Sequence, residues 1–340
     1  IRRVHPDPRQ LNEAAEKLKL SKQPIIIAGG GILYSEAEKE LSDFAKKHNI
    51  PVTPTVMGIG CMTKDDPYYI GAIGCLGEGS SNSLSKDTDL ALAIGTKLGD
   101  FTTGSWSNFQ NEDFKLVSIN TARFDVTKHL ATPVISDAKI GLLELSKALG
   151  DWRAPNNWYE RSIDERKKWD SYVEKQSGPT NQELPSYAHA VGAVYRNADP
   201  SDIVVTAAGG LVGEVVQIWK PKELNTFETE WGFSCMGYEI SGALGIKMAK
   251  PDQDVIVFVG DGSYLLHNSD IYSSVLYDKK LIIVVCDNGG HMVINRLQLA
   301  KGGKEYLCNL KEARATNLQF VDFEAHAKSM GANGETVTST

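Results

Sequence analysis

Two short polar segments carry the side chains in this sequence that are best suited to bind a metal ion. Gly260-Asp261-Gly262-Ser263 directly follows the apolar residues 255–259, and Asp287-Asn288-Gly289-Gly290 directly follows the apolar residues 281–286. The Asp261 carboxylate, the Asn288 carboxamide oxygen and a free backbone carbonyl are hard oxygen donors, which suit a Mg²⁺ ion that also holds phosphate oxygens. The alternative interpretation is a pair of ordinary turns, because Asp-Gly and Asn-Gly dipeptides are common where strands end.

The elements around these segments favour the metal-binding interpretation. Residues 255–259 and 281–286 are continuously apolar and rich in β-branched side chains, as is typical of central strands covered on both faces. A helix predicted over 269–277 joins them, so the two strands should be parallel neighbours. Ligands of open α/β sheets bind at the carboxyl ends of strands, where Asp261 and Asn288 would then meet. The neighbouring glycines would let the backbone approach phosphate groups closely.

Strand-like and helix-like segments alternate along the whole chain, which predicts an α/β fold of two consecutive doubly wound parallel-sheet domains. We predict a Rossmann-like first domain over residues 1–150, a linker with a highly charged helix over 151–185, and a second domain over 186–340. The predicted strands are 25–27, 51–55, 90–94, 115–119, 203–207, 255–259 and 281–286. The predicted helices are 35–47, 139–149, 160–176, 186–196, 236–250 and 269–277.

The composition excludes several classes of protein. With 41% hydrophobic and 23% charged residues among 340, the chain is neither disordered nor collagen-like. Its 36 basic and 43 acidic residues give a net charge of −7, so we expect no nucleic-acid or membrane partner. Apolar runs such as 281–286 are too short to span a bilayer. Five widely spaced cysteines without a CxxC pair favour reduced thiols in the cytoplasm over disulfides or a zinc site.

The polar segments and their surroundings resemble the thiamine-diphosphate-dependent enzyme family, within the acetolactate synthase-like superfamily. A Gly-Asp-Gly-Ser run, followed 27 residues after its aspartate by Asn-Gly-Gly, is similar to the family's diphosphate motif. Residues 234–245 resemble the family's segment around the two coenzyme rings, and 25–31, 51–58 and 89–95 resemble its central domain. One departure is Asp287, which replaces the first Asn of the usual pair. The ligand position itself is intact, so we expect metal binding to survive.

Carried over by position, the resemblance implies thiamine diphosphate and Mg²⁺ as cofactors. The implied metal ligands are Asp261, Asn288 and the Gly290 carbonyl. Met236 would force the coenzyme rings into a V, although ordinary core packing is the alternative for a methionine. The Ser234 carbonyl would hold the aminopyrimidine amino group. The remaining implied contacts are Gly262 and Ser263 at the diphosphate, and Gly209, Gly210 and Leu211 on its far side.

Other runs resemble the branch of the family that opens a six-membered cyclic diketone to 5-deoxyglucuronate in myo-inositol catabolism. They are residues 206–211, 230–235, 268–274 and 293–298. The branch implies a hydrolase that acts on a C–C bond of a polyol diketone, as a homo-oligomer (dimer or tetramer). The alternatives are an acetolactate synthase-like carboligase or decarboxylase acting on a 2-oxo acid, and a non-enzymatic ligand-binding protein. Candidate polyol contacts are Asn295, Arg296 and Gln298, and candidate proton carriers are His267 and His291, each with a purely structural alternative.

The resemblance also implies parts of the site that lie outside this chain. The family's activating glutamate belongs to an amino-terminal pyrimidine-binding domain, so we expect the fragment to be inactive alone and can name no catalytic residue within it. The segment that starts at Ile1 is unlike a signal peptide, and residues 335–340 carry no closing cap, so we expect an internal piece truncated at its carboxyl end. Gly29-Gly30-Gly31 lacks the GxGxxG spacing, and we expect no FAD there.

Overall fold

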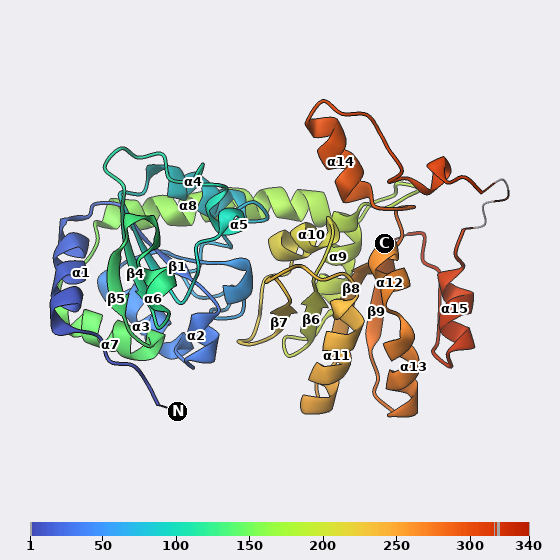
Figure 1. Cartoon of the computed structure of the whole chain (residues 1–340), viewed down its shortest axis with the longest axis horizontal. Helices are drawn as coiled ribbons and strands as arrows, with labels where there is room; N and C mark the ends of the chain where they lie inside the picture. The colour runs from blue at the N-terminus through green and yellow to red at the C-terminus, as the bar shows by residue number, and fades with distance from the viewer. Residues whose placement is uncertain (1, 316, 318–319, 340) are drawn as a thin grey trace. The chain divides into compact units, whose positions relative to one another are not determined.

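The computed structural model describes residues 2–315, 317 and 320–339, which form two compact units (Figure 1). Unit 1 runs up to Lys175 and includes 220–225, while unit 2 comprises 176–219 and the residues from 226 onward. Each unit contains one parallel sheet, of five strands in unit 1 and of four in unit 2. The predicted fold class, two parallel-sheet α/β domains, is therefore confirmed.

The sheet of unit 1 has the order β2-β1-β3-β4-β5. Strands β1 and β3 are buried along their whole length, and helices α1, α3 and α7 cover one face while α4 and α8 cover the other (Figure 1). The strands are β1 (Pro24–Ala28), β2 (Val52–Pro54), β3 (Leu90–Ile94), β4 (Lys115–Asn120) and β5 (Thr132–Ile135). The helices are α1 (Pro8–Leu20), α2 (Gly31–Tyr34), α3 (Glu38–His48), α4 (Gly79–Asp87), α5 (Asp100–Thr103), α6 (Arg123–Val126), α7 (Ala138–Leu149) and α8 (Asn156–Ser177).

Helix α8 is the charged helix that the sequence placed in the linker, and most of it packs on unit 1. The Trp158 indole is 2% exposed and donates from Nε1 to the Pro24 carbonyl at 2.8 Å. Further along, Arg166 donates to the Tyr69 carbonyl at 2.8 Å. The unit boundary lies at 175/176, almost at the end of this helix. Its apolar and polar contacts thus make most of α8 part of the first unit.

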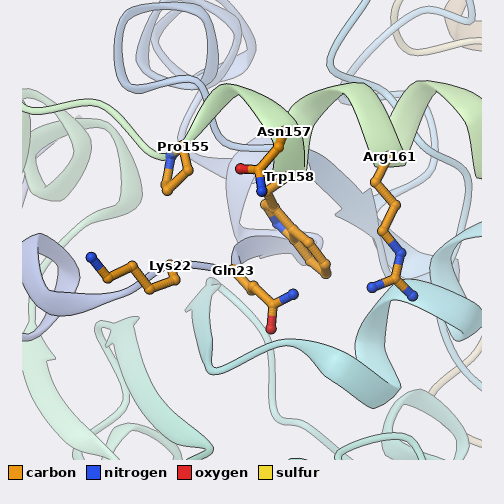
Figure 2. A pocket seen from close by; sticks show the side chains of 6 residues that line it. All are labelled: Lys22, Gln23, Pro155, Asn157, Trp158 and Arg161. Carbon is orange, nitrogen blue, oxygen red and sulfur yellow. The ribbon is translucent and has the colours of Figure 1, made fainter.

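A surface pocket of about 520 Å³ lies where α8 meets the residues before β1 (Figure 2). Because it adjoins the amino end of β1, it is on the opposite edge of the sheet from the carboxyl ends, where ligands of parallel sheets bind. We attribute it to the way α8 is anchored. The residues that line it are Lys22, Gln23, Pro155, Asn157, Trp158 and Arg161.

The glycine triplet after β1 permits a close backbone contact with the end of β3. A Cβ on Gly29 would lie 2.3 Å from the Gly95 carbonyl oxygen, and one on Gly31 would lie 2.5 Å from the Gly95 Cα. The Gly31 N–H donates to that carbonyl at 3.0 Å. The triplet therefore has a structural role in closing the two strand ends together.

The sheet of unit 2 has the order β7-β6-β8-β9. Helices α9 and α10 lie on one side of it and α11 and α13 on the other (Figure 1). Chain order reverses between β6 and β8, which makes their carboxyl ends the switch point where such sheets bind ligands. The strands are β6 (Ile203–Thr206), β7 (Phe227–Thr229), β8 (Val255–Gly260) and β9 (Ile282–Cys286). The helices are α9 (Tyr187–Asn197), α10 (Leu211–Ile218), α11 (Tyr238–Ala249), α12 (Asp261–Leu266), α13 (Ser269–Leu276), α14 (Met292–Ala300) and α15 (Phe323–Ser329).

Several element boundaries differ from the predicted ones for local reasons. Helix α3 begins at Glu38, three residues later than predicted, because Glu36 has a φ of 51°. Helix α11 begins at Tyr238 because Gly237, at φ 95°, interrupts the helical pattern.

Among the described residues, none of the helices combines the length and apolar character needed to cross a bilayer. All five cysteines are free thiols, as predicted.

Candidate active site

The carboxyl ends of β8 and β9 bring the two predicted metal-binding segments together. Gly260 pairs with Cys286, so the residues that follow both strands leave the same edge of the sheet. The Asp261 carboxylate is buried, and its Oδ2 accepts a hydrogen bond from the Gly290 N–H at 2.8 Å. Burial raises the pKa of Asp261, while backbone amides that include the one of Gly290 act against this rise.

The loop after β9 is held by residues 308–310. The His291 N–H donates to the Cys308 carbonyl at 2.8 Å, and the Leu310 N–H donates to the Gly289 carbonyl at 2.9 Å. Gly290 has a φ of 143°, and a Cβ there would lie 2.2 Å from the Cys308 oxygen. Only glycine therefore fits this predicted ligand position, because both its backbone angle and the close approach exclude a side chain.

Tyr187, at the start of α9, is a site residue that the sequence did not reveal. Its hydroxyl accepts a hydrogen bond from the Asn288 Nδ2 atom. Burial, with the nearby Cys286 thiol, raises the pKa of Tyr187 to about 12. The predicted helix start at Ser186 located this region, but no local pattern links it to a loop about a hundred residues later.

A buried carboxylate, Glu239, joins three parts of the site and was also missed. It accepts hydrogen bonds from the Ala208 N–H at 3.1 Å and from the Gly237 N–H at 2.9 Å. The Ser263 hydroxyl is within 3.0 Å of both carboxylate oxygens and also accepts from the Gly237 N–H at 2.8 Å. The side chain of Ser263 is therefore directed at the protein, which leaves its backbone as the part able to face a ligand.

Met236, Gly262 and His291 lie against one another. A Cβ on Gly262 would lie 3.0 Å from the His291 Cε1 atom and 3.5 Å from the Met236 Cε atom. Met236 is 39% exposed, so it is not an ordinary core residue in this unit. Ser234 just before it has a φ of 54°, and its hydroxyl donates to the Ala207 carbonyl at 2.9 Å.

The three predicted diphosphate contacts after β6 have different surroundings. Gly209 has open space around it, at a φ of 78°, whereas Gly210 lies directly under the Arg296 guanidinium, whose Nη2 atom would be 2.4 Å from a Cβ there. Leu211 begins α10 with its side chain buried in the core. The structure thus brings a cation from α14, Arg296, to the loop predicted to line a diphosphate.

The other polar candidates are mostly engaged in structural contacts. Asn295 is buried and donates to the Glu305 carboxylate at 2.8 Å. The His267 Nε2 atom lies 3.4 Å from the Asp270 carboxylate. Among the described residues there is no group of three or more His, Cys, Asp or Glu side chains that could hold a metal. A metal site here would therefore use one carboxylate with amide and carbonyl oxygens, a donor set typical of Mg²⁺ with a phosphate ligand.

Comparison with known families accounts for both units. Residues 11–145 match the thiamine pyrophosphate enzyme central domain, and residues 207–340 match the C-terminal TPP-binding domain of the same family. The chain belongs to the thiamine pyrophosphate enzyme family. This confirms the resemblance drawn from the sequence, and it puts the edge that carries Asp261 and Asn288 in the family's coenzyme-binding domain.

Similar proteins in three bacteria carry one name. The chain is 34% identical over 369 residues to proteins named 3D-(3,5/4)-trihydroxycyclohexane-1,2-dione hydrolase from Bacillus anthracis, Bacillus cereus strain AH820 and Bacillus thuringiensis strain Al Hakam. Each match covers 100% of this chain and 57% of the relative. The chain thus spans little more than half the length of these relatives.

Proposed function

We propose that this chain supplies the metal and diphosphate half of a thiamine-diphosphate site. Asp261, Asn288 and the Gly290 carbonyl would bind Mg²⁺, and the backbone at Gly262 and Ser263 would face the diphosphate. The juxtaposition of the buried Asp261 carboxylate with the Gly290 N–H at 2.8 Å is the observation that carries this proposal. Among the described residues, no cationic side chain forms an ion pair with Asp261, and a buried carboxylate without one favours a bound cation.

The remaining residues of the edge suit the other parts of the coenzyme. Met236 is part-exposed beside Gly262, where it could support the two rings from below. The backbone of the Gly209–Gly210 loop, with Leu211 anchored in the core behind it, would line the far side of the diphosphate. The Ser234 carbonyl remains our candidate for the aminopyrimidine amino group. When bound, the coenzyme supplies a nucleophilic carbon and a place to hold the negative charge that C–C cleavage leaves.

We propose that the whole protein is a hydrolase that opens the ring of a trihydroxycyclohexane-1,2-dione. The names of the 34%-identical relatives support this substrate, as do the runs at 206–211, 230–235, 268–274 and 293–298. The exposed Arg296 guanidinium, which lies against Gly210, is suited to polar and anionic groups alike and does not discriminate between a polyol diketone and a 2-oxo acid. The active form would be a homo-oligomer, and the 91% exposure of Phe233 beside the site is consistent with cover from another domain or chain.

Two measurements test this function. The full-length protein is assayed with the cyclic dione and with pyruvate, and we expect ring opening of the dione and no acetolactate from pyruvate. Acetolactate formation without ring opening would establish the carboligase alternative instead. A thermal-shift titration compares thiamine diphosphate plus Mg²⁺ with ADP and with FAD. Stabilisation by ADP or FAD alone would favour a nucleotide-binding protein.

A further inference from the structure

The side chain of Asn288 is exposed and little constrained by its own loop. The two residues after it are glycines, Gly289 and Gly290, with φ values of 75° and 143°. Neither of them has a side chain that could pack against the Asn288 carboxamide. A carboxamide has one oxygen and one NH₂ group of nearly equal size, and only the oxygen can bind a cation. An unrestrained Asn288 would therefore present the wrong group to a metal for part of the time.

Tyr187 supplies the missing restraint from another element. The Asn288 Nδ2 atom donates to the Tyr187 hydroxyl, which leaves the Oδ1 atom free. Tyr187 is itself fixed at the first turn of α9, where the Ser186 hydroxyl accepts from the His189 N–H at 3.3 Å and His189 Nδ1 accepts from the Ser186 N–H at 3.2 Å. This reciprocal cap fixes the backbone at the start of α9, which carries Tyr187.

We propose that Tyr187 is a positioning residue that selects the metal-binding orientation of Asn288. By accepting the amide N–H, its hydroxyl leaves the Asn288 Oδ1 atom as the group available to a cation held by Asp261. Outer-sphere partners of this kind typically change metal affinity by roughly 10- to 100-fold. This inference rests on the proposed function, because it assumes that Asp261 and Asn288 bind a cation.

The test is Mn²⁺ binding to the full-length protein with thiamine diphosphate present, measured by electron paramagnetic resonance. Tyr187→Phe removes only the hydroxyl, and Tyr277→Phe is the matched control on an exposed tyrosine of the same unit. We expect Tyr187→Phe to weaken Mn²⁺ binding by roughly 10-fold. The Mn²⁺ affinity of Tyr277→Phe should stay unchanged, and so should the melting temperatures of both variants. Equal Mn²⁺ affinity in Tyr187→Phe and the unmodified protein would overturn the inference.

A double-variant comparison separates positioning from a general effect on the site. If Tyr187 acts through Asn288, adding Tyr187→Phe to Asn288→Ala should cause no further loss of Mn²⁺ affinity. Fully additive losses would show that the hydroxyl acts independently of Asn288 and would overturn the proposal. Asp261→Ala provides the remaining control. Unchanged Mn²⁺ binding in that variant would refute the proposed metal site itself, a result distinct from failure of the Tyr187 inference alone.

Discussion

The Ser263 hydroxyl lies 2.9 and 3.0 Å from the two oxygens of the buried Glu239 carboxylate. Ser263 follows β8, and Glu239 belongs to the first turn of α11, so this contact joins two segments that both carry predicted coenzyme residues. The same carboxylate binds the Ala208 N–H, in the loop after β6. Glu239 therefore fixes three loops of the candidate site relative to one another.

Glu239→Gln should weaken both the fold of unit 2 and coenzyme binding. A glutamine has one oxygen in place of two, so its NH₂ group would face either the Ala208 N–H, which loses its acceptor, or the Gly237 N–H, which keeps only the Ser263 hydroxyl. A buried donor left in this way costs about 1–3 kcal/mol. Urea unfolding and calorimetric titration with thiamine diphosphate measure the two effects, with the exposed Glu112→Gln as control. No change in either measurement would contradict the role assigned to Glu239.

Asp261→Ala should abolish Mg²⁺-dependent binding of thiamine diphosphate in the full-length protein. A hard dication then loses its anionic ligand, whereas Asn288→Ala removes a neutral donor and should weaken binding less. Isothermal titration calorimetry of both variants at fixed Mg²⁺ gives the two affinities. If the Asp261→Ala variant binds thiamine diphosphate as tightly as the unmodified protein does, the assignment of Asp261 as a metal ligand is wrong.

Met236→Ala should lower turnover while metal and diphosphate affinity stay unchanged. The side chain lies beside Gly262 at the exposed edge, so its proposed task is to shape the coenzyme and not to retain it. A misplacement of about 1 Å can cost up to roughly 100-fold in rate. Steady-state kinetics and calorimetry separate the two quantities, and Met248→Ala on the exposed side of α11 is the control. Normal turnover in a folded Met236→Ala protein would show that Met236 only packs against its neighbours and does not shape the coenzyme.

His48 should make unit 1 less stable as pH falls. Its ring is fully buried, with Nδ1 2.7 Å from the Trp152 carbonyl and Nε2 3.0 Å from the Ser146 hydroxyl. Burial lowers the pKa of His48 below its ordinary value of 6.5. The unfolded chain therefore takes up this proton at a higher pH than the folded chain, so unfolding becomes easier as the solution is acidified through about pH 6.5.

His48→Gln tests this pH dependence. Glutamine cannot take up the proton, so the free energy of unfolding should fall less steeply between pH 7 and pH 5 than in the unmodified protein. The exposed His5→Gln should leave the slope unchanged. Urea unfolding at three pH values gives the slopes, and identical slopes for His48→Gln and the unmodified protein would contradict the assignment.

The features that depend on residues adjacent along the chain could be predicted from the amino-acid sequence. Continuously apolar runs predicted β6 and β8, which are almost wholly buried, because strands covered on both faces need no polar alternation. The run at 281–286 predicted β9 as well, but that strand lies at the edge of its sheet and is mostly half-buried, not central as predicted. The polar segments at Asp261 and Asn288 were recognisable because each directly follows such a run. Parallel pairing then implied that they share an edge, and Gly260 does pair with Cys286.

Which side chains surround that edge depends on contacts between segments that are distant along the chain. Tyr187 and Glu239 looked like ordinary helix residues, because their partners Asn288 and Ser263 lie far away along the chain. The edge strands β5 and β7 were missed as well, since β5 contains a proline and β7 has only three residues. Hydrogen bonds between distant segments depend on how helices and strands pack, and no periodicity within a single segment encodes that packing.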